Sequence, residues 1–401
     1  MEIKKIIKYP FMFVITILAV ISILIMQLSY LLNGARPYKD AVSEVLTQYS
    51  GKISESEQKN LVEKNKRLVE YMFQYNVDNI LPDGYSEESL KVEYNQSCAI
   101  TQQLEYYDKI KDERKQIEEN VARVRKLAEK GGAVSGYDQA LCNQIETDYG
   151  KQIEFEVYDN QGVTFLFDML KIHAWDFLCV LLLVVLFCGI FSREHERKLF
   201  SAIYSSKNGR ARLYFKKLLT ATEITFVYSV IDIAITIGIV CVEYGVKGLS
   251  QPIQSISQFG YYPYSWSILG GLVFICSMKV LVLEVITILI CAISTCFKKS
   301  VVSALVSGIV LFGVMGFYCY CNHIVNYGGN ITEFASRAIE KMKTVLFVPL
   351  LEGSTYFGMY DDVNILGHPL NRMWLNLIVT VLAGAVLFGL GLWSYCKRQR
   401  D

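Results

Sequence analysis

Six long apolar runs are the strongest constraint on what this 401-residue chain can fold into. About 20 residues in a helix cross the hydrocarbon core of a bilayer, and runs of 18 or more apolar residues are typical of such helices. Because lipid offers no hydrogen-bond partners to the backbone, each run is expected to be helical. The runs cover residues 11–32, 175–191, 220–242, 266–296, 301–321 and 373–395. They predict an all-α polytopic membrane protein with six transmembrane helices.

The distribution of charge predicts how these helices are oriented. The N-terminal segment, the 192–219 loop, the 298–299 loop and the C-terminal tail together hold sixteen Lys and Arg residues. Residues 33–172, by contrast, contain 25 acidic and 18 basic residues. Since basic loops stay on the cytoplasmic side, both termini are predicted to be cytoplasmic and 33–172 extracellular. We therefore expect a multi-pass protein of the cell membrane, specifically of a bacterial plasma membrane.

Three regions follow from this topology. Residues 1–32 form the cytoplasmic N-terminus and the first transmembrane helix, 33–172 an extracellular domain, and 173–401 transmembrane helices 2 to 6. Apolar residues at helical spacing in 55–75 and 100–130 predict a helical hairpin in the extracellular domain. Alternating apolar residues in 151–157 predict a short strand followed by a turn, a minor β element. This domain could capture a substrate, gate an exit, contact an envelope partner or merely stiffen a dimer.

Cysteines offer one open question in the extracellular domain. Of the eleven cysteines in the chain, only Cys98 and Cys142 fall there. In an oxidising compartment they could close one disulfide. Two free thiols are an equally good interpretation.

Several kinds of chemistry have no support in the sequence. No G-x-x-x-x-G-K-[ST] phosphate loop, H-E-x-x-H zinc motif or G-x-S-x-G nucleophile motif is present, and the four histidines are widely spread. We therefore expect no enzymatic activity, no metal, no cofactor and no nucleic-acid partner. Energy for any uphill transport must come from an ion gradient or from another polypeptide.

Three charged residues interrupt the apolar runs. Asp232 and Glu284 lie about 18 Å inside the predicted spans at 1.5 Å per residue, and Lys279 lies further out. Each costs roughly 2.5–3.5 kcal/mol at the centre of a membrane helix, so these side chains are expected to face the protein interior. They could line a polar pathway or gate. A structural bridge between Asp232 and Lys279 is the favoured interpretation.

The 192–219 loop has features of a cytoplasmic coupling segment. It carries eight Lys and Arg residues but only two acids, Glu194 and Glu196. Residues 199–204 have helical amphipathicity, and Asn208 and Gly209 then interrupt the pattern. A charged helix under the membrane that joins two spans is well placed to receive force from a soluble partner.

In this segment the chain resembles the ABC-2 type permeases, the membrane subunits of ATP-binding-cassette exporters. The family has a phenylalanine, an acidic turn, an amphipathic helix, a small-residue break and then basic residues. The corresponding residues here are Phe191, Glu194 and Glu196, Leu199 to Tyr204, Ser205 to Gly209, Arg210 or Arg212, and Lys216 or Lys217. Lys198 and Leu199 replace the usual Gly-Thr. Residues 344–351 are similar to the re-entrant external helices of these permeases.

The resemblance implies a mechanism. Two permease subunits in the lipid bilayer would form the pathway as a homo- or heterodimer, and each would bind a separate ATP-binding subunit through residues 193–204. The resemblance gives Phe200, Ile203 and Tyr204 apolar contacts with that subunit, and it gives Glu194, Glu196 and Arg197 control of electrostatic register. The cargo could be a peptide, a lipid or a drug. Two other interpretations stay open: a membrane-anchored sensor or immunity protein that binds a ligand outside, and a secondary carrier.

Overall fold

In the part of the chain that the structure describes, five helices are long and apolar enough to cross a membrane. The computed structural model describes residues 10–33, 38–129, 136–150, 153–196, 209–327, 332–358 and 361–397. The five spans comprise α8 (Ala174–Phe187) with its continuation α9 (Ser192–Glu196), α11 (Gly209–Glu243), α12 (Ile268–Cys296), α13 (Ser300–Tyr327) and α16 (Arg372–Lys397). The chain is therefore an all-α, membrane-embedded protein, as predicted, and its minor strands lie at Asp362–Ile365 and His368–Asn371 rather than at the predicted 151–157.

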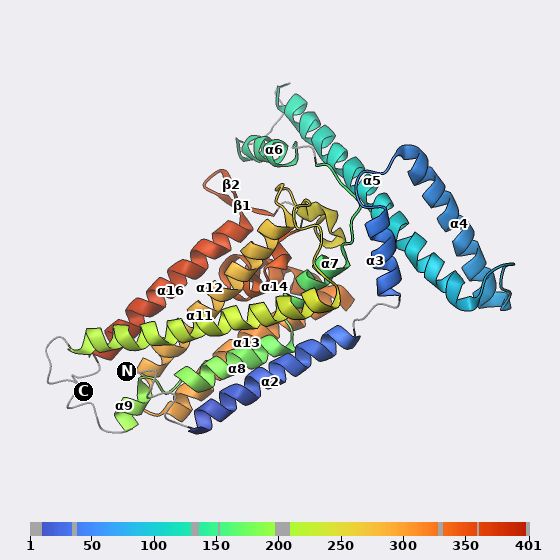
Figure 1. Cartoon of the computed structure of the whole chain (residues 1–401). Helices are drawn as coiled ribbons and strands as arrows, with labels where there is room; N and C mark the ends of the chain where they lie inside the picture. The colour runs from blue at the N-terminus through green and yellow to red at the C-terminus, as the bar shows by residue number, and fades with distance from the viewer. Residues whose placement is uncertain are drawn as a thin grey trace.

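The first predicted span is the helix α2 (Pro10–Asn33), which contains the shorter apolar stretch Val20–Asn33. It lies beside α8 and runs antiparallel to it in Figure 1. Its outward side chains, such as Ile25 and Leu32, are apolar and exposed, whereas Gln27 is fully buried against the bundle. An apolar exposed face suits lipid better than water.

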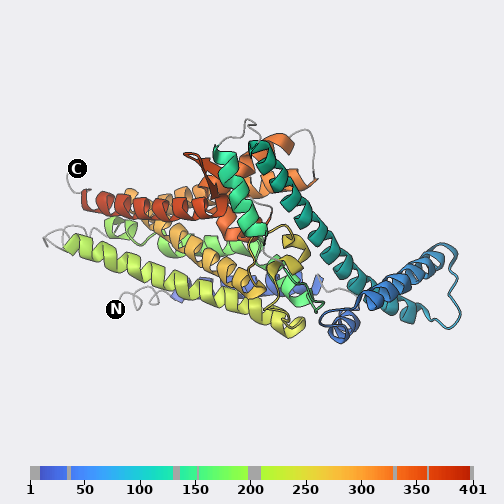
Figure 2. The same ribbon diagram turned by 90° about the horizontal axis from the view of Figure 1, so that it is seen from above.

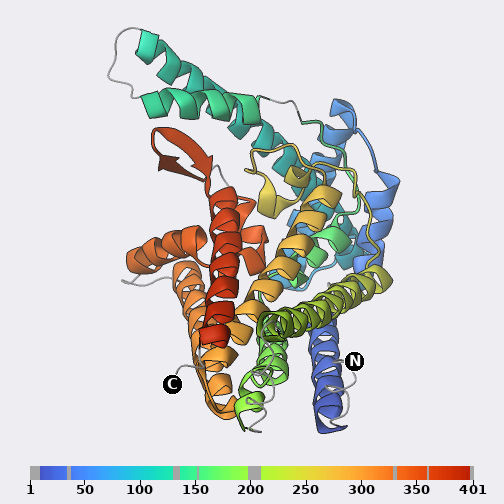
Figure 3. The ribbon, with the colours of Figure 1, turned by 90° about the vertical axis from the view of Figure 1, so that its left-hand side faces the viewer.

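α12 lies at the centre of the bundle, where it contacts α8, α11, α13 and α16. The core around it includes Phe187, Ile286 and Met315, all of which are buried. On the outer face of α13, Leu305 and Ile309 are exposed. A bundle that is apolar both inside and outside is typical of membrane helices. Figure 3 shows α9 and the C-terminal end of α16 at one end of the bundle, and the segment between α2 and α8 at the other.

Residues 38–159 form an insert domain between α2 and α8. Its helices are α3 (Lys39–Gln48), α4 (Glu55–Asp78), α5 (Glu87–Glu129) and α6 (Gly136–Tyr149). α4 begins with a capping box, in which Ser54 and Glu57 exchange side-chain and backbone hydrogen bonds. α4 and α5 pack against each other and project beyond the bundle (Figure 2), which confirms the predicted helical hairpin.

The predicted strand at 151–157 is wrong. Among the described residues of this stretch, only Val157 makes a bridge, with Gly51, and 153–156 have no regular secondary structure. The turn expected after it is also wrong, because α7 (Gln161–Met169) begins there. Alternation predicts which side chains share a face, but a strand also needs a neighbour to pair with.

The insert domain is joined to the bundle through the loop between α11 and α12. This loop contains the 3-10 turns η1 (Ile253–Ser255) and η2 (Ser257–Phe259). Tyr106 Oη on α5 donates to the carbonyl oxygens of Gln254 and Ile256 at 2.7 and 3.1 Å, and Tyr149 Oη donates to Tyr261 O at 2.7 Å. Tyr106 thus gives the buried Gln254 carbonyl a donor, and both tyrosines tie the insert domain to the loop.

Short elements complete the end of the bundle that carries the insert domain. They are α14 (Thr332–Val345), α15 (Val348–Glu352), the 3-10 turn η3 (Ser354–Tyr356), β1 (Asp362–Ile365) and β2 (His368–Asn371). β1 and β2 are antiparallel, and Leu366 and Gly367 form their turn with φ of 52° and 88°. Two positive φ angles are typical of the hairpin turn whose twist matches the strands. The sequence analysis did not predict this hairpin, because Leu366 stands where such turns usually have Asn, Asp or Gly.

Candidate functional site

Phe191 and Ser192, which follow α8, are packed against three other membrane helices. The ring of Phe191 stacks on Tyr214 with centroids 5.1 Å apart and meets the edge of Tyr395 at 5.2 Å. The backbone N–H groups of Phe191 and Ser192 both donate to Ser294 Oγ, at 3.2 and 3.3 Å. Helices α11, α12 and α16 therefore fix the position from which the cytoplasmic segment departs.

Glu194 points into the protein. Its carboxylate pairs with Lys217 Nζ at 2.6 Å and accepts a hydrogen bond from Tyr395 Oη at 2.9 Å. Lys217 Nζ also donates to Ile190 O at 2.6 Å, and the Glu194 and Lys217 side chains are only 11% and 10% exposed. This corrects the expectation that Glu194 faces a docking partner, since its carboxylate is occupied inside the fold.

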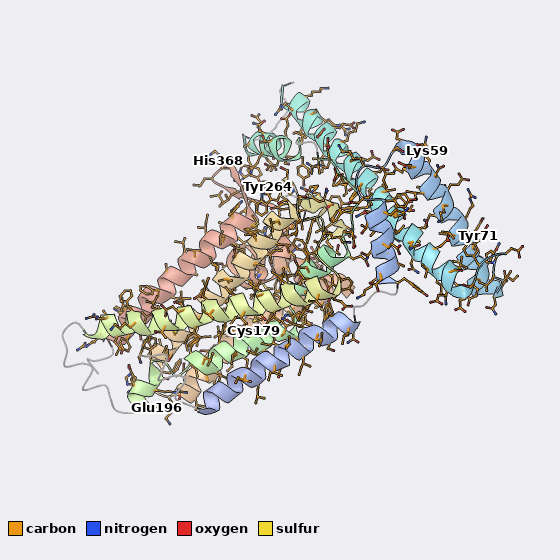
Figure 4. The ribbon with its side chains drawn as sticks, viewed as in Figure 1. Lys59, Tyr71, Cys179, Glu196, Tyr264 and His368 are labelled. Atoms are coloured by element: carbon orange, nitrogen blue, oxygen red, sulfur yellow. The ribbon has the colours of Figure 1, made fainter. Side chains whose placement is uncertain are left out.

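Glu196 is exposed but also engaged. Its Oε1 accepts from the backbone N–H and from Oγ of Ser300, at 2.7 and 2.9 Å. Ser300 is the first residue of α13, where unpaired N–H groups and the helix dipole favour a negative charge. Figure 4 places Glu196 at the far end of α9. We call Glu194, Glu196, Lys217, Ser300 and Tyr395 the α9 anchor.

Four predicted partner-binding residues lie outside the described residues: Arg197, Phe200, Ile203 and Tyr204. The structure does describe the segments on either side of them, α9 and the start of α11. Sequence reasoning missed the anchoring roles of Ser294, Ser300 and Tyr395. Serine and tyrosine near the ends of apolar runs are common, so the sequence carries no signal that singles these out.

A second group of polar residues lies inside the bundle. Lys279 Nζ is 4.0 Å from Asp232 Oδ2, which supports the predicted bridge, but it is only 2.7 Å from Asp176 Oδ1. All three side chains are at most 4% exposed. Asp176 was missed because it stands at the edge of a predicted span. An acid three residues after His173, in the first turn of a helix, is the capping pattern that could have revealed it.

The same group reaches the first helix. Gln27 Nε2 on α2 donates to Thr236 Oγ1 at 3.1 Å and to Asp232 Oδ1 at 3.4 Å. Cys179, labelled on α8 in Figure 4, accepts a hydrogen bond from Tyr228 Oη at 3.0 Å. We call Gln27, Asp176, Asp232, Thr236 and Lys279 the polar cluster. It links α2, α8, α11 and α12.

Glu284 is not part of the polar cluster. It stands five residues after Lys279 on α12, which places the two about 140° apart around the helix. Both carboxylate oxygens of Glu284 are shielded, and neither has a hydrogen-bond partner among the described residues. The structure therefore brings Asp232 and Lys279 together and leaves Glu284 alone.

Cys98 and Cys142 are both free. Cys98 Sγ donates to Asn65 Oδ1 at 3.5 Å, whereas Cys142 lies on α6, which contacts α5 near Arg125 through Asn143. Positions 98 and 125 are about 40 Å apart along a helix at 1.5 Å per residue. Since a disulfide needs Cα atoms within about 7 Å, the disulfide interpretation is wrong for this structure.

A groove of about 320 Å³ in the insert domain is lined by residues on both sides of the Gly51–Val157 bridge and by α4 and α5. Gly51 and Val157 exchange two backbone hydrogen bonds, at 2.9 and 3.0 Å. In the same register Ile53 and Phe155 would form the next hydrogen-bonded pair. No backbone hydrogen bond joins them in the described part of the domain, and the groove lies between them. Its floor includes Tyr107, whose ring stacks on Phe155 with centroids 4.7 Å apart.

No protein-family model, curated protein or solved structure matches this chain.

Proposed function

We propose that this chain is the membrane subunit of an ATP-binding-cassette exporter of the ABC-2 type. It spans the cell membrane six times, with α2 as the first span and both termini in the cytoplasm. The α9 anchor is the observation that carries the proposal. Two carboxylates of a short loop are bonded to α11, α13 and α16. A segment that is bonded to three membrane helices transmits a force applied by a cytoplasmic partner to those helices, whereas a flexible segment would not.

The mechanism follows from these contacts. An ATP-binding subunit docks on residues 197–208, with Phe200, Ile203 and Tyr204 as apolar contacts. Closure of that subunit on ATP presses the segment toward the membrane and displaces α9 and the start of α11 together. Because Glu194 joins Lys217 and Tyr395, α16 moves with them. Two such subunits rock apart and back, which opens a path for cargo.

Affinity purification in mild detergent tests this proposal. The tagged full-length chain should retain a second polypeptide with a phosphate-loop motif, and it should stimulate or restrain that partner's ATP hydrolysis. The triple variant Phe200→Ala, Ile203→Ala, Tyr204→Ala should lose the partner and keep its melting temperature. A wild-type particle that transports cargo with no ATP-hydrolysing partner would exclude the proposal.

The groove between Ile53 and Phe155 supports a second candidate, a sensor or immunity protein with an external ligand. Free backbone groups facing each other across a groove can accept an extended peptide as an added strand. In this function the insert domain binds a peptide, and the α9 anchor passes the signal to a cytoplasmic partner. A translocation path is then unnecessary.

A phage-displayed library of random linear peptides, panned on the full-length chain in nanodiscs, separates the two functions. A sensor should enrich peptides that bind the wild type, lose at least tenfold in affinity with Tyr107→Ala, and bind Val69→Ala normally. Val69 is the control because it is 44% exposed on α4 and does not line the groove. No enrichment, or equal loss in both variants, argues against the sensor.

A further inference from the structure

The polar cluster contains more negative than positive charge. Within the described residues it has one ammonium group, Lys279, and two carboxyl groups, Asp176 and Asp232. All three are buried between membrane helices. An uncompensated charge in such surroundings is costly, and a buried acid commonly avoids the cost by keeping its proton. The cluster is neutral if one of the two acids is protonated.

The surroundings of Asp176 and Asp232 differ, and the difference indicates which of the two acids keeps a proton. Asp176 contacts Lys279 Nζ at 2.7 Å and accepts from the backbone N–H of His173 at 2.8 Å. It also lies in the first turn of α8, where the helix dipole favours an anion. Asp232 lies in the interior of α11, away from either helix end and 4.0 Å from Lys279 Nζ, and its carboxyl group accepts one hydrogen bond from the described residues, from Gln27 at 3.4 Å. Asp176 is therefore the better anion.

In the described part of the bundle, Lys279 is the one cation paired with Asp232. Burial lowers the pKa of His173 below its ordinary value, so this imidazole is neutral near pH 7. Tyr228 Oη donates a hydrogen bond to Cys179 Sγ. Thr236 Oγ1 donates to the backbone oxygen of Asp232 rather than to its carboxylate.

Gln27 gives an independent sign that a donor is missing. Its side chain reaches into the polar cluster and is 0% exposed, yet Gln27 Oε1 has no hydrogen-bond partner among the described residues. A proton on Asp232 would add an O–H donor beside this amide. Buried acceptors without partners are uncommon, so the unpartnered Gln27 Oε1 favours a hydrogen-bond donor on Asp232.

We propose that Asp232 is a proton-binding site, occupied at neutral pH, at the junction of α2, α8, α11 and α12. The bound proton leaves a single Lys279–Asp176 ion pair and makes the polar cluster neutral. Its release would place a second anion between α2 and α11, where one weak hydrogen bond holds it. Proton occupancy thereby governs how firmly the first span is held. This site does not depend on the proposed export function.

Infrared spectroscopy of the full-length chain in nanodiscs tests whether the proton is present. The wild-type spectrum at pH 7 should contain the carbonyl band of an un-ionised carboxylic acid that Asp232→Asn lacks. Glu57→Gln is the matched control. Hydrogen bonds from the Ser54 hydroxyl and backbone N–H hold the pKa of Glu57 below its ordinary value, so its loss should remove only carboxylate absorption. Identical acid bands in the wild type and Asp232→Asn would overturn the proposal.

Melting temperatures assign the proton to one acid. Asparagine resembles a protonated aspartate, so Asp232→Asn should melt close to the wild type, whereas Asp176→Asn should melt clearly lower. The reverse order, or failure of Asp232→Asn to fold, would overturn the assignment. A sodium titration in choline buffer separates a proton from a metal cation. A melting temperature that rises with sodium in the wild type but not in Asp232→Asn would mean that the ligand is sodium.

Discussion

Replacing Lys279 with Gln is expected to lower the free energy of unfolding by about 3–5 kcal/mol, because removing one partner of a buried ion pair leaves the other charge uncompensated. Asp176 is the residue left behind, 2.7 Å from where the ammonium stood and shielded from water. Denaturation of the purified chain in mixed micelles, followed by tryptophan fluorescence, measures the change. Loss of folded protein on expression is the stronger form of the same result.

Lys52→Gln is the matched control for this experiment. Lys52 also pairs with one acid, Glu154, at 2.5 Å, but the two side chains are 63% and 75% exposed. Water screens an exposed pair and competes with it, so this variant should unfold like the wild type. Equal losses in free energy of unfolding in the two variants would contradict this prediction. The buried Lys279–Asp176 pair would then stabilise the fold no more than an exposed pair does.

The membrane helices could be predicted from the sequence because a single physical requirement defines them. A segment that enters lipid must be apolar over its whole length and must satisfy its own backbone. The run at 266–296, for example, became α12, which begins at Ile268 after Ser267 caps the helix. The charged residues inside the runs were also informative. A charge is costly in lipid, so Lys279 and Asp232 were predicted to face the protein interior, where both are buried.

Contacts between distant segments could not be predicted in the same way. Glu194 and Glu196 are two residues apart in an acidic turn, yet one is buried against Lys217 and the other is exposed at Ser300. Local sequence is nearly the same for both, so the difference comes from the packing of α11, α13 and α16. The strand prediction for 151–157 was wrong for a related reason. Val157 pairs with Gly51, which lies about a hundred residues earlier in the chain.

The second large effect is expected at Glu194. Glu194→Gln should lower the free energy of unfolding by about 3–5 kcal/mol, since it leaves Lys217 buried without its carboxylate partner. Glu196→Gln should cost only about 0.3–1 kcal/mol, because the exposed glutamine keeps an acceptor oxygen for Ser300 and loses only the negative charge at the start of α13. Chemical denaturation of the two variants under identical conditions gives the comparison.

The exchanged variant Glu194→Lys with Lys217→Glu tests whether the pair itself, rather than either side chain, stabilises this end of the bundle. Restoring opposite charges at the same two positions should recover part of the stability that Glu194→Lys loses alone. Recovery will be incomplete, because Tyr395 Oη would then face an ammonium group and Ile190 O would lose its donor. If Glu194→Gln is no more harmful than Glu196→Gln, the α9 anchor is not a rigid connection. Force applied to residues 197–208 would then be dissipated before it reached α16.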